Sequence, residues 1–478
     1  MSPWARLCLA ALGLHSTPIS VSRQSCKSHS LSLYSLLVTV RAESIHNVRS
    51  LASPWSVLPP QRLSHWLTSC LVFGPIIFAP MSESWGRRPV FLVSFTIYTA
   101  FTLGCALSPN WPAFLFFRFM LGCGAAVPQT VSGGLFCDIY ADLRSRGMAV
   151  AMLGLTSNVG PLIGPIISGF TSTTVWQWQF WCALVLACVN WVMLLFLPET
   201  CAPVLNACHP NGAAGENQHK PIASAAKEMP LSLRRQARVF TRPIRILSEP
   251  LVLFTDLFIL YQYVIYFLYF GAYPVIFRGT YGMSDGMSAL MFIPTGIGAV
   301  LAIAIFAAWD KFHKRGVERG SPWALREEYR RLPLACLGGP LLALSEFWLG
   351  WIARPDIHWI IPAASGIPLG IGIDLTFLAL NNYLTDAYDI YSASALASSV
   401  FTRNVLAAVL IPFTTYPLYE NMGTAWACTL LGCLCVILIP IPFAFIRWGP
   451  AMRKRNPFCQ RLDRMRNGSA DEDLAFPL

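Results

Sequence analysis

Long apolar stretches recur along this chain, and they constrain its fold more than any other feature. Eleven stretches of about 20 mainly apolar residues alternate with short polar segments, and a helix of that length crosses the hydrocarbon of a bilayer. Only helices and closed barrels satisfy their backbone polar groups there. We therefore predict an all-α integral membrane protein. The predicted spans are residues 66–80, 89–108, 112–137, 147–170, 178–197, 251–270, 287–308, 333–352, 359–380, 393–415 and 424–446.

The composition excludes an ordinary soluble protein. Of 478 residues, 55% are hydrophobic and 12% are charged, about half the charged share of an average soluble domain. The formal net charge is +11, but the basic residues stand between apolar spans. We attribute this charge to membrane topology and predict no nucleic-acid binding. The 15 cysteines include no C-x-x-C pair, so neither a disulfide framework nor a metal site is predicted.

From residue 66 onward, the Lys and Arg outside the predicted spans lie almost entirely in one set of loops. Six loops on one side hold 25 of them, whereas the opposite loops hold only Arg278 and Arg354. Cytoplasmic loops retain positive charge, so the central linker and the carboxyl terminus are predicted to face the cytoplasm. The six loops are residues 81–88, 141–146, 198–250, 309–331, 386–391 and 447–478.

The predicted spans form two groups around a polar linker. We expect an amino-terminal bundle at residues 66–197, a cytoplasmic linker at 198–250, a carboxyl-terminal bundle at 251–447 and a cytoplasmic tail at 448–478. Residues 1–65 form an atypical amino-terminal segment, in which 31–40 are the longest clearly apolar run. Ten residues do not cross a bilayer easily. This segment is either a divergent or wrongly assigned terminus or a true, short first span.

Two motifs in the first group resemble those of the major facilitator superfamily. Residues 79–88 are similar to G-x-x-x-D-R-x-G-R-R/K, with Ala79 for the first Gly, Glu83 for Asp and Ser84 for the first basic residue. Gly86, Arg87 and Arg88 match. The pattern R-x-x-x-G-x-G-A-A is similar to Arg118, Gly122, Gly124, Ala125 and Ala126. The resemblance implies the fold of that superfamily, with two six-helix bundles of which eleven spans are identified and the first is doubtful.

Further motifs resemble the fungal twelve-span drug:proton antiporters, a group that includes efflux pumps for azoles, toxins and polyamines. Residues 160–169 are similar to G-P-x-x-G-P-x-x-G-G, with Ser168 for one Gly; Gly160, Pro161, Gly164 and Pro165 match. Pro198-Glu199-Thr200 is similar to the motif that closes the sixth span, and residues 383–388 also resemble this group. The resemblance covers about residues 66–460, with an atypical or truncated amino terminus.

Ionisable residues within the predicted spans are expected to face a cavity, because a charge in hydrocarbon costs about 2.5–3.5 kcal/mol. Asp374 lies mid-span between small residues, where a carboxylate could carry a proton; the alternative is a buried pair with Arg403. The resemblance ties Arg118 to proton coupling, with a structural pair as its alternative. The candidates for proton coupling or substrate contact are Arg118, Asp374, Glu346, Asp256, Tyr261, Tyr266 and Asn382.

Other polar and aromatic residues are expected to have structural or conformational roles. We expect Tyr269, Phe270 and Tyr273 in an interfacial aromatic belt, and Asn381 and Asn382 in interhelical hydrogen bonds. The resemblance implies that residues 83–88 latch the two halves together in one conformation; alternatively, the basic pair only sets topology. Residues 160–169 are expected either to pack helices or to govern closure and ion leak. Asp138, Arg146, Asp386 and Arg403 are expected in cytoplasmic charge networks.

These features together predict a carrier without enzymatic activity or cofactor. No G-x-x-x-x-G-K-[ST] motif is present, so direct use of ATP is not expected. We predict a proton-coupled secondary transporter that exports drugs, toxins or secondary metabolites by alternating access. Its predicted partners are a small-molecule substrate, protons and membrane lipids, and we expect a monomer in the plasma membrane. The alternatives are a proton symporter that imports polyamines or other nutrients, a transport-dead truncated homologue, and a vacuolar location.

Overall fold

The computed structural model describes residues 85–125, 143–171, 177–195, 246–247, 249–326, 328–388 and 392–455, together with 78, 81, 82, 127, 131, 135 and 460. The atypical segment 1–65, most of the predicted first span at 66–80, most of the linker, Glu83 and Asp138 lie outside these residues. The backbone of Arg146 is described but its side chain is not.

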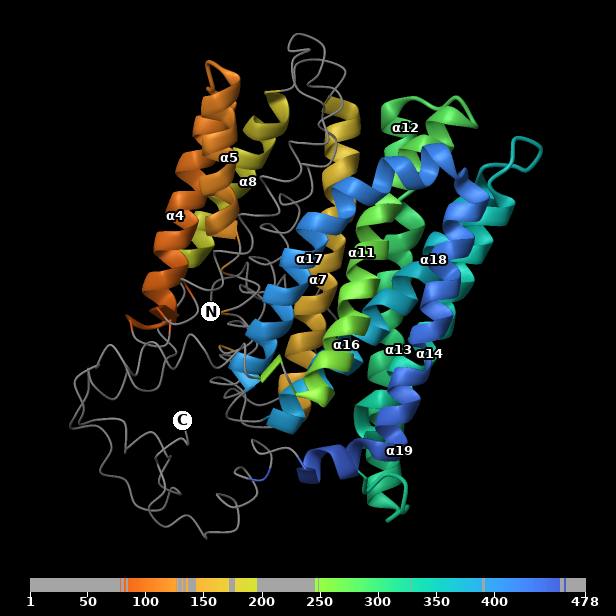
Figure 1. Cartoon of the computed structure of the whole chain (residues 1–478). Coiled ribbons are helices and arrows are strands. Elements are labelled where there is room, and N and C mark those ends of the chain that lie inside the picture. Colours follow the sequence, from red (N-terminus) through yellow and green to blue (C-terminus); the bar gives the residue numbers. More distant parts are fainter. Residues whose placement is uncertain are drawn as a thin grey trace, which may run out of the picture.

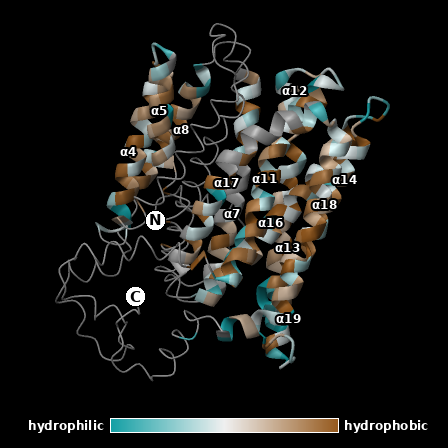
Figure 2. Cartoon of the chain, viewed as in Figure 1, coloured by the Kyte–Doolittle hydropathy of each residue, from teal (hydrophilic) through white to brown (hydrophobic). Residues whose placement is uncertain are grey.

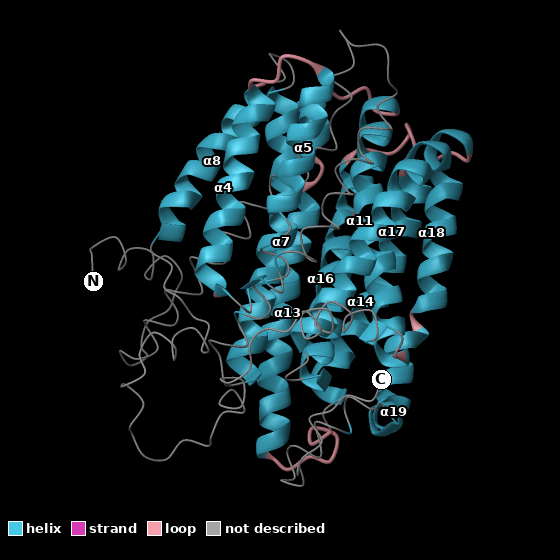
Figure 3. Cartoon of the chain, turned by 60° about the vertical axis from the view of Figure 1, so that its left-hand side comes forward, coloured by secondary structure: helices cyan, strands magenta, loops and turns pink. Residues whose placement is uncertain are grey.

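The regular structure of the described residues is entirely helical (Figure 3). Within the described part of the chain, seven helical segments are long and apolar enough to cross a membrane: Arg87–Ala106, Trp178–Leu195, Pro250–Gly279, Asp285–Glu318, Glu328–Ile352, Ile360–Tyr388 and Thr424–Lys454. Apolar residues line the length of these helices, and polar residues gather toward their ends (Figure 2). This distribution matches a bilayer with water on both sides.

The helices of the amino-terminal half are α4 (Arg87–Ala106), α5 (Trp111–Ala125), α7 (Leu143–Thr171) and α8 (Trp178–Leu195). Those of the carboxyl-terminal half are α11 (Pro250–Gly279), α12 (Asp285–Leu290), α13 (Ile293–Glu318), α14 (Glu328–Ile352), α15 (Ile360–Ala364), α16 (Gly366–Tyr388), α17 (Ser392–Asn421), α18 (Thr424–Leu438) and α19 (Pro440–Arg455).

Several helices extend beyond the apolar stretches that predicted them. Helix α11 ends at Gly279 rather than near residue 270, and α13 ends at Glu318 rather than near 308. An apolar stretch marks only the hydrocarbon, whereas the helix continues into the interface, where water solvates polar side chains. Two predicted spans are also interrupted: α12 meets α13 just before Pro294, and α18 meets α19 at Pro440. Proline lacks the N–H that continues the helical ladder.

Helices α4, α5 and α8 stand together, whereas α7 lies among the helices of the carboxyl-terminal half (Figure 1). The close crossings within that half depend on glycine. An ideal Cβ at Gly370 of α16 would lie 2.9 Å from the backbone nitrogen of Ala299 in α13. One at Gly372 would lie 2.9 Å from the carbonyl oxygen of Gly338 in α14. Side chains smaller than alanine therefore let α16 pack between α13 and α14.

Candidate functional site

Five Asp, Glu and Arg side chains among the described residues are buried within the predicted spans, and they form the centre of the candidate transport site. One of them lies on α5, and the others lie on α11, α14, α16 and α17. A buried charge persists in a membrane protein when it has a partner, lines a cavity or is neutralised by a proton. The five are Arg118, Asp256, Glu346, Asp374 and Arg403.

The glycine crossings place Asp374 between two neighbouring helices. Its side chain is 1% exposed, and the close approach of α13 and α14 at Gly370 and Gly372 encloses this part of α16. Gln262 of α11 donates a hydrogen bond from Nε2 to the carbonyl oxygen of Ile373, at 3.2 Å. Three helices therefore converge at the level of Asp374, which keeps this carboxyl group as a candidate for proton or substrate contact.

Asp256 of α11 faces Arg403 of α17. The Asp256 carboxyl group adjoins Ser399 and interacts electrostatically with Arg403. The Arg403 guanidinium lies over the rings of Tyr263 and Phe377, 4.7 Å and 5.6 Å from their centroids. Arg403 is thus held within the membrane by an acid and two aromatic faces. Asp256 is the acid that acts on Arg403 among the described residues, and the alternative pairing of Asp374 with Arg403 stays a prediction.

Arg118 is a buried cation of the amino-terminal half, as Arg403 is of the carboxyl-terminal half. Its guanidinium lies 5.0 Å from the ring centroid of Phe114 and 4.6 Å from that of Phe180, and its side chain is 4% exposed. Aromatic faces stabilise a desolvated guanidinium electrostatically. The first ring belongs to α5 and the second to α8, so Arg118 joins these two helices.

The tyrosines of α11 lie inside the bundle. Tyr261 donates a hydrogen bond to the carbonyl oxygen of Leu431 in α18, and Tyr266 packs edge-on against Phe270 at 5.1 Å. The expected interfacial belt is wrong for Tyr269, Phe270 and Tyr273, which are all buried in one core cluster. The reason is that neighbouring helices cover α11 where these three residues lie.

The asparagines of α16 do not link helices through the hydrogen bonds expected for them. The side chain of Asn381 donates to the carbonyl oxygen of Phe377, and that of Asn382 donates to that of Leu378, both at 2.9 Å. Each bond returns to the same helix four residues back. Local carbonyls compete successfully for such short polar side chains. Asn382 is buried, and its hydrogen bond is within α16.

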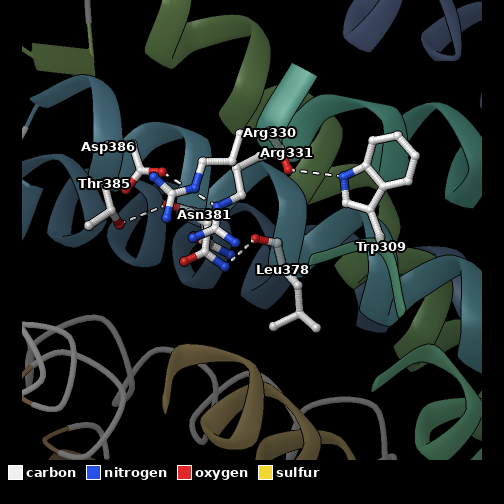
Figure 4. Close-up of polar contacts among 8 residues, drawn as sticks. Trp309, Arg330, Arg331, Leu378, Asn381, Thr385 and Asp386 are labelled. Atoms are coloured by element: carbon white, nitrogen blue, oxygen red, sulfur yellow. Dashed lines mark hydrogen bonds and ion pairs between the residues drawn. The ribbon is translucent and has the colours of Figure 1, made fainter. Parts of the chain in front are cut away.

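A charge cluster lies at the predicted cytoplasmic ends of α14, α16 and α19. Figure 4 shows its members Arg331 and Asp386. Arg331 Nε pairs with Asp386 Oδ2 at 3.4 Å, and the Arg331 guanidinium lies 5.6 Å from the ring centroid of Phe306 in α13. Glu328 pairs with Arg453. The sequence placed Asp386 in a cytoplasmic charge network, with Arg146 and Arg403 among the available partners. Among the described side chains, Asp386 pairs with Arg331, because α14 begins beside the end of α16.

The motif at residues 79–88 turns the chain into α4. Gly86 has φ of 102°, a conformation that side chains other than glycine rarely adopt. Arg87 donates from Nη1 to Ser82 Oγ at 2.8 Å, and Arg88 donates from Nη2 to the carbonyl oxygen of Leu195 at 3.3 Å. The second contact places a cation at the carboxyl end of α8, where the helix dipole favours it. Both contacts lie within the amino-terminal half, and the latch between halves stays a prediction.

Helix α7 contacts the carboxyl-terminal half at three levels. Ideal Cβ atoms would lie 3.0 Å from the Arg331 guanidinium carbon at Gly147, 2.9 Å from Leu378 Cδ2 at Gly154, and 2.9 Å from the carbonyl oxygen of Asp285 at Gly169. Gly160, Pro161, Gly164 and Pro165 are all buried between the second and third levels. The small residues of α7 therefore form the contact between the two halves.

Sequence reasoning overlooked two contributors to this arrangement. Gln262 supports the backbone beside Asp374, and its only signal was a polar residue inside an aromatic run. Arg331 was counted among the basic residues of the loop at 309–331, whereas its side chain contacts Asp386, Phe306 and α7 at Gly147. No group of three or more His, Cys, Asp or Glu that could hold a metal occurs among the described residues.

The comparison with protein families decides what kind of protein carries this arrangement. The model of the Major Facilitator Superfamily matches residues 61–412. The chain belongs to the Major Facilitator Superfamily. It is therefore a multi-pass membrane protein of a family whose members bind small-molecule substrates, and the predicted resemblance is confirmed.

Curated fungal members of the superfamily resemble the chain over most of its length. It is 34% identical over 400 residues to the MFS-type transporter kojT of Aspergillus flavus, covering 80% of this chain and 69% of that protein. It is 33% identical over 396 residues to Efflux pump FUB11 of Gibberella moniliformis, covering 80% and 65%. The chain thus spans about two thirds of the length of the curated relatives it matches.

Solved structures place the chain in the same fold. The proton:xylose symporter XylE of E. coli superimposes with a TM-score of 0.65 at 16% identity, covering 89% of this chain and 96% of that one. The human organic anion transporter MFSD10 gives a TM-score of 0.54 at 15% identity, covering 89% and 100%. The all-α superfamily fold predicted from the sequence is confirmed.

Proposed function

We propose that this chain is a proton-coupled secondary transporter that exports small organic molecules, of the drug, toxin or secondary-metabolite class. Membership of the superfamily makes it a secondary transporter, and relatives at 33–34% identity include an efflux pump. The chain acts as a monomer in the plasma membrane, with its linker and tail in the cytoplasm. It converts the proton gradient into transport and carries out no enzymatic reaction.

The observation that carries the proton coupling is the burial of three carboxyl groups within the described spans of the carboxyl-terminal half. Asp256, Glu346 and Asp374 are each at most 3% exposed, and a membrane interior strongly disfavours the ionised form of such a group. Proton binding therefore changes the charge of the site. In another conformation, a substrate could reach the same carboxyl groups. In the proposed cycle, a proton from outside binds a carboxylate, weakens the hold on the substrate, and later leaves to the cytoplasm.

Helix α7 contacts the other half of the protein, so it is the element through which substrate or proton binding changes the conformation. It contacts α12, α16 and the Arg331 cluster, so movement of one half against the other has to alter these three contacts. Rocking of the two halves about a central site is the movement by which transporters with paired repeats alternate their access. The contacts at opposite ends of α7 are candidates for opening in opposite phases of the cycle.

The direction of transport is tested with rhodamine 6G, in fungal cells that lack their own drug exporters. We expect cells that express the chain to accumulate less dye, and a protonophore to abolish the difference. The Lys314→Ala variant is the matched control, because Lys314 is 58% exposed and forms only a surface pair with Glu318. Higher accumulation on expression would contradict export and favour the import alternative. Fluorescence of a tagged chain at the vacuole would contradict the proposed location.

A further inference from the structure

Glu346 differs from Asp256 because none of the described cations acts on it. It is 0% exposed, and neither carboxyl oxygen has a hydrogen-bond partner among the described residues. Asp256 interacts with Arg403, but no described cation acts on Glu346. An isolated carboxylate in such surroundings would cost several kcal/mol, so the group is stable there only when a proton neutralises it.

The surroundings of Glu346 form a chamber of weakly polar hydroxyl and thiol groups. Three tyrosines of α11, one tyrosine of α17 and two cysteines of α18 interact electrostatically with Glu346: Tyr261, Tyr269, Tyr273, Tyr419, Cys428 and Cys435. The apolar members of the same core cluster include Leu342 and Leu349. Asp374 of α16, which also packs against α14, is not among the groups that act on Glu346.

Further hydroxyl groups lie between the surroundings of Glu346 and one end of the bundle. Tyr269 donates to the carbonyl oxygen of Ser345 at 3.1 Å, next to Glu346 in the chain. Tyr273 lies one turn further along α11, and its hydroxyl adjoins Thr295 and Ser365. An ideal Cβ at Gly366 would lie 3.1 Å from the same hydroxyl oxygen, which shows how closely these helices meet.

The position of Glu346 along α14 indicates from which side a proton reaches it. Ile352, at one end of α14, is six positions from Glu346, or about 9 Å along the helix axis. Glu328, at the other end, is eighteen positions away, or about 27 Å. The Ile352 end is the one that the distribution of Lys and Arg predicts to face outside. A proton that drives export enters from outside, so the shorter path has the required direction.

We infer that Glu346 is a proton-binding site, closed and occupied by a proton in this conformation, that exchanges its proton with the outer side of the membrane. The proton binds one carboxylate oxygen to give the neutral acid, and it leaves to water when α11 and α14 separate at their outer ends. This inference rests on the proposed proton-coupled transport and assigns the coupling to a residue of the carboxyl-terminal half.

Infrared difference spectra of the full chain in phosphatidylcholine nanodiscs test the site without a substrate. Between acidic and alkaline buffer, we expect a carbonyl band of a protonated carboxyl group that is present in the wild type, absent in Glu346→Gln and retained in Glu318→Gln. Gln has the shape of the neutral acid, and Glu318 is an exposed control. An unchanged difference band in Glu346→Gln would overturn the inference. So would a Glu346 band of equal strength at every pH, which would indicate a permanently neutral structural acid.

A second measurement needs no variant and applies even if Glu346→Gln does not fold. Dicyclohexylcarbodiimide reacts with protonated carboxyl groups in apolar surroundings, and mass spectrometry locates the adduct. We expect labelling of wild-type Glu346 to fall by about tenfold for each pH unit above its midpoint. Absence of the adduct, or labelling that does not change with pH, would contradict the inference.

The same preparation separates this inference from the proposed function. In liposomes with an imposed pH gradient, wild-type protein is expected to move rhodamine 6G, and Glu346→Gln is expected to lose the response to the gradient. Wild-type protein that ignores the gradient while Glu346 titrates would refute proton-driven export of this dye and leave the proton site standing. Equal responses of wild type and Glu346→Gln would refute the coupling role of Glu346 alone.

Discussion

The two halves of this transporter differ in the charges that they bury: both bury arginines, but among the described residues only the carboxyl-terminal half also buries carboxyl groups. Among the described residues, the amino-terminal half buries the arginines Arg87 and Arg118 and no carboxylate. The carboxyl-terminal half buries Asp256, Glu346 and Asp374 within its spans. Guanidinium groups remain charged in proteins, whereas carboxyl groups gain and lose protons. In the described residues, the groups able to carry a proton are therefore concentrated in one half, and the other half supplies a fixed positive charge.

Both halves pack their helices in the same way. An ideal Cβ at Gly124 would lie 2.7 Å from the carbonyl oxygen of Ser94, so α5 and α4 meet as closely as α16 and α14 do at Gly372. Without a hydrophobic effect between helices in lipid, close van der Waals contact has to stabilise the bundle. The difference between the halves therefore lies in their polar groups and not in how they pack, which is why substitutions of those groups test it most directly.

The largest expected effect is on proton coupling. Asp374→Asn removes a titratable group from the carboxyl-terminal half, and Arg118→Ala removes the fixed charge of the other half. Each is expected to reduce the response of rhodamine 6G transport to an imposed pH gradient by about tenfold or more, a typical size for a coupling energy between sites. Transport by reconstituted protein, measured at several pH values, checks this. Wild-type pH profiles for both variants would remove these residues from the coupling mechanism.

The next effect concerns stability and the pair formed by Asp256 and Arg403. Asp256→Ala leaves Arg403 without its acidic partner inside the membrane, and we expect a loss of about 3 kcal/mol in the free energy of unfolding. Arg403→Leu added to Asp256→Ala should restore part of it, with a coupling energy of about 1–3 kcal/mol. Unfolding of the four purified proteins in mixed micelles measures this double-mutant cycle. Additive losses would show that the two residues do not interact.

The smallest effect concerns the boundary between the halves. Gly154→Leu would overlap Leu378 of α16, and we expect a loss of about 1–3 kcal/mol together with slower transport. Gly279→Leu is the matched control, because an added Cβ there would meet nothing within 4 Å. Thermal unfolding and dye transport are measured for both. Equal behaviour of the two variants would show that α7 does not need its close contact with the carboxyl-terminal half.

The sequence predicted the helical architecture well because hydropathy reports directly on the solvent of each helix. Every helical segment from residue 250 onward was predicted. The differences between predicted and observed bounds lie at the helix ends and at proline breaks. The chemistry was less predictable. Asp256, Glu346 and Asp374 were recognised as costly charges, but nothing in the chain showed that Asp256 has Arg403 for a neighbour while Glu346 lies among tyrosines.

Two expectations failed because they treated helices in isolation. Tyr269, Phe270 and Tyr273 stand near one end of α11, which in a lone helix would place them at the interface; neighbouring helices enclose them instead. Asn382 was expected to reach another helix, yet a carbonyl of its own helix is nearer. Exposure and partner choice depend on which helices lie alongside, and periodicity within one segment contains no such information.

Local composition was enough to predict a membrane protein of long helices with ionisable groups at costly positions, because the thickness of the hydrocarbon sets the length and polarity of each span. Which of those groups have partners depends instead on the arrangement of the helices in space. Contacts between α11, α14, α17 and α18 join residues up to 170 positions apart, as in the hydrogen bond from Tyr261 to Leu431. Such proximity arises only when the helices pack, and it separates the paired Asp256 from the enclosed Glu346.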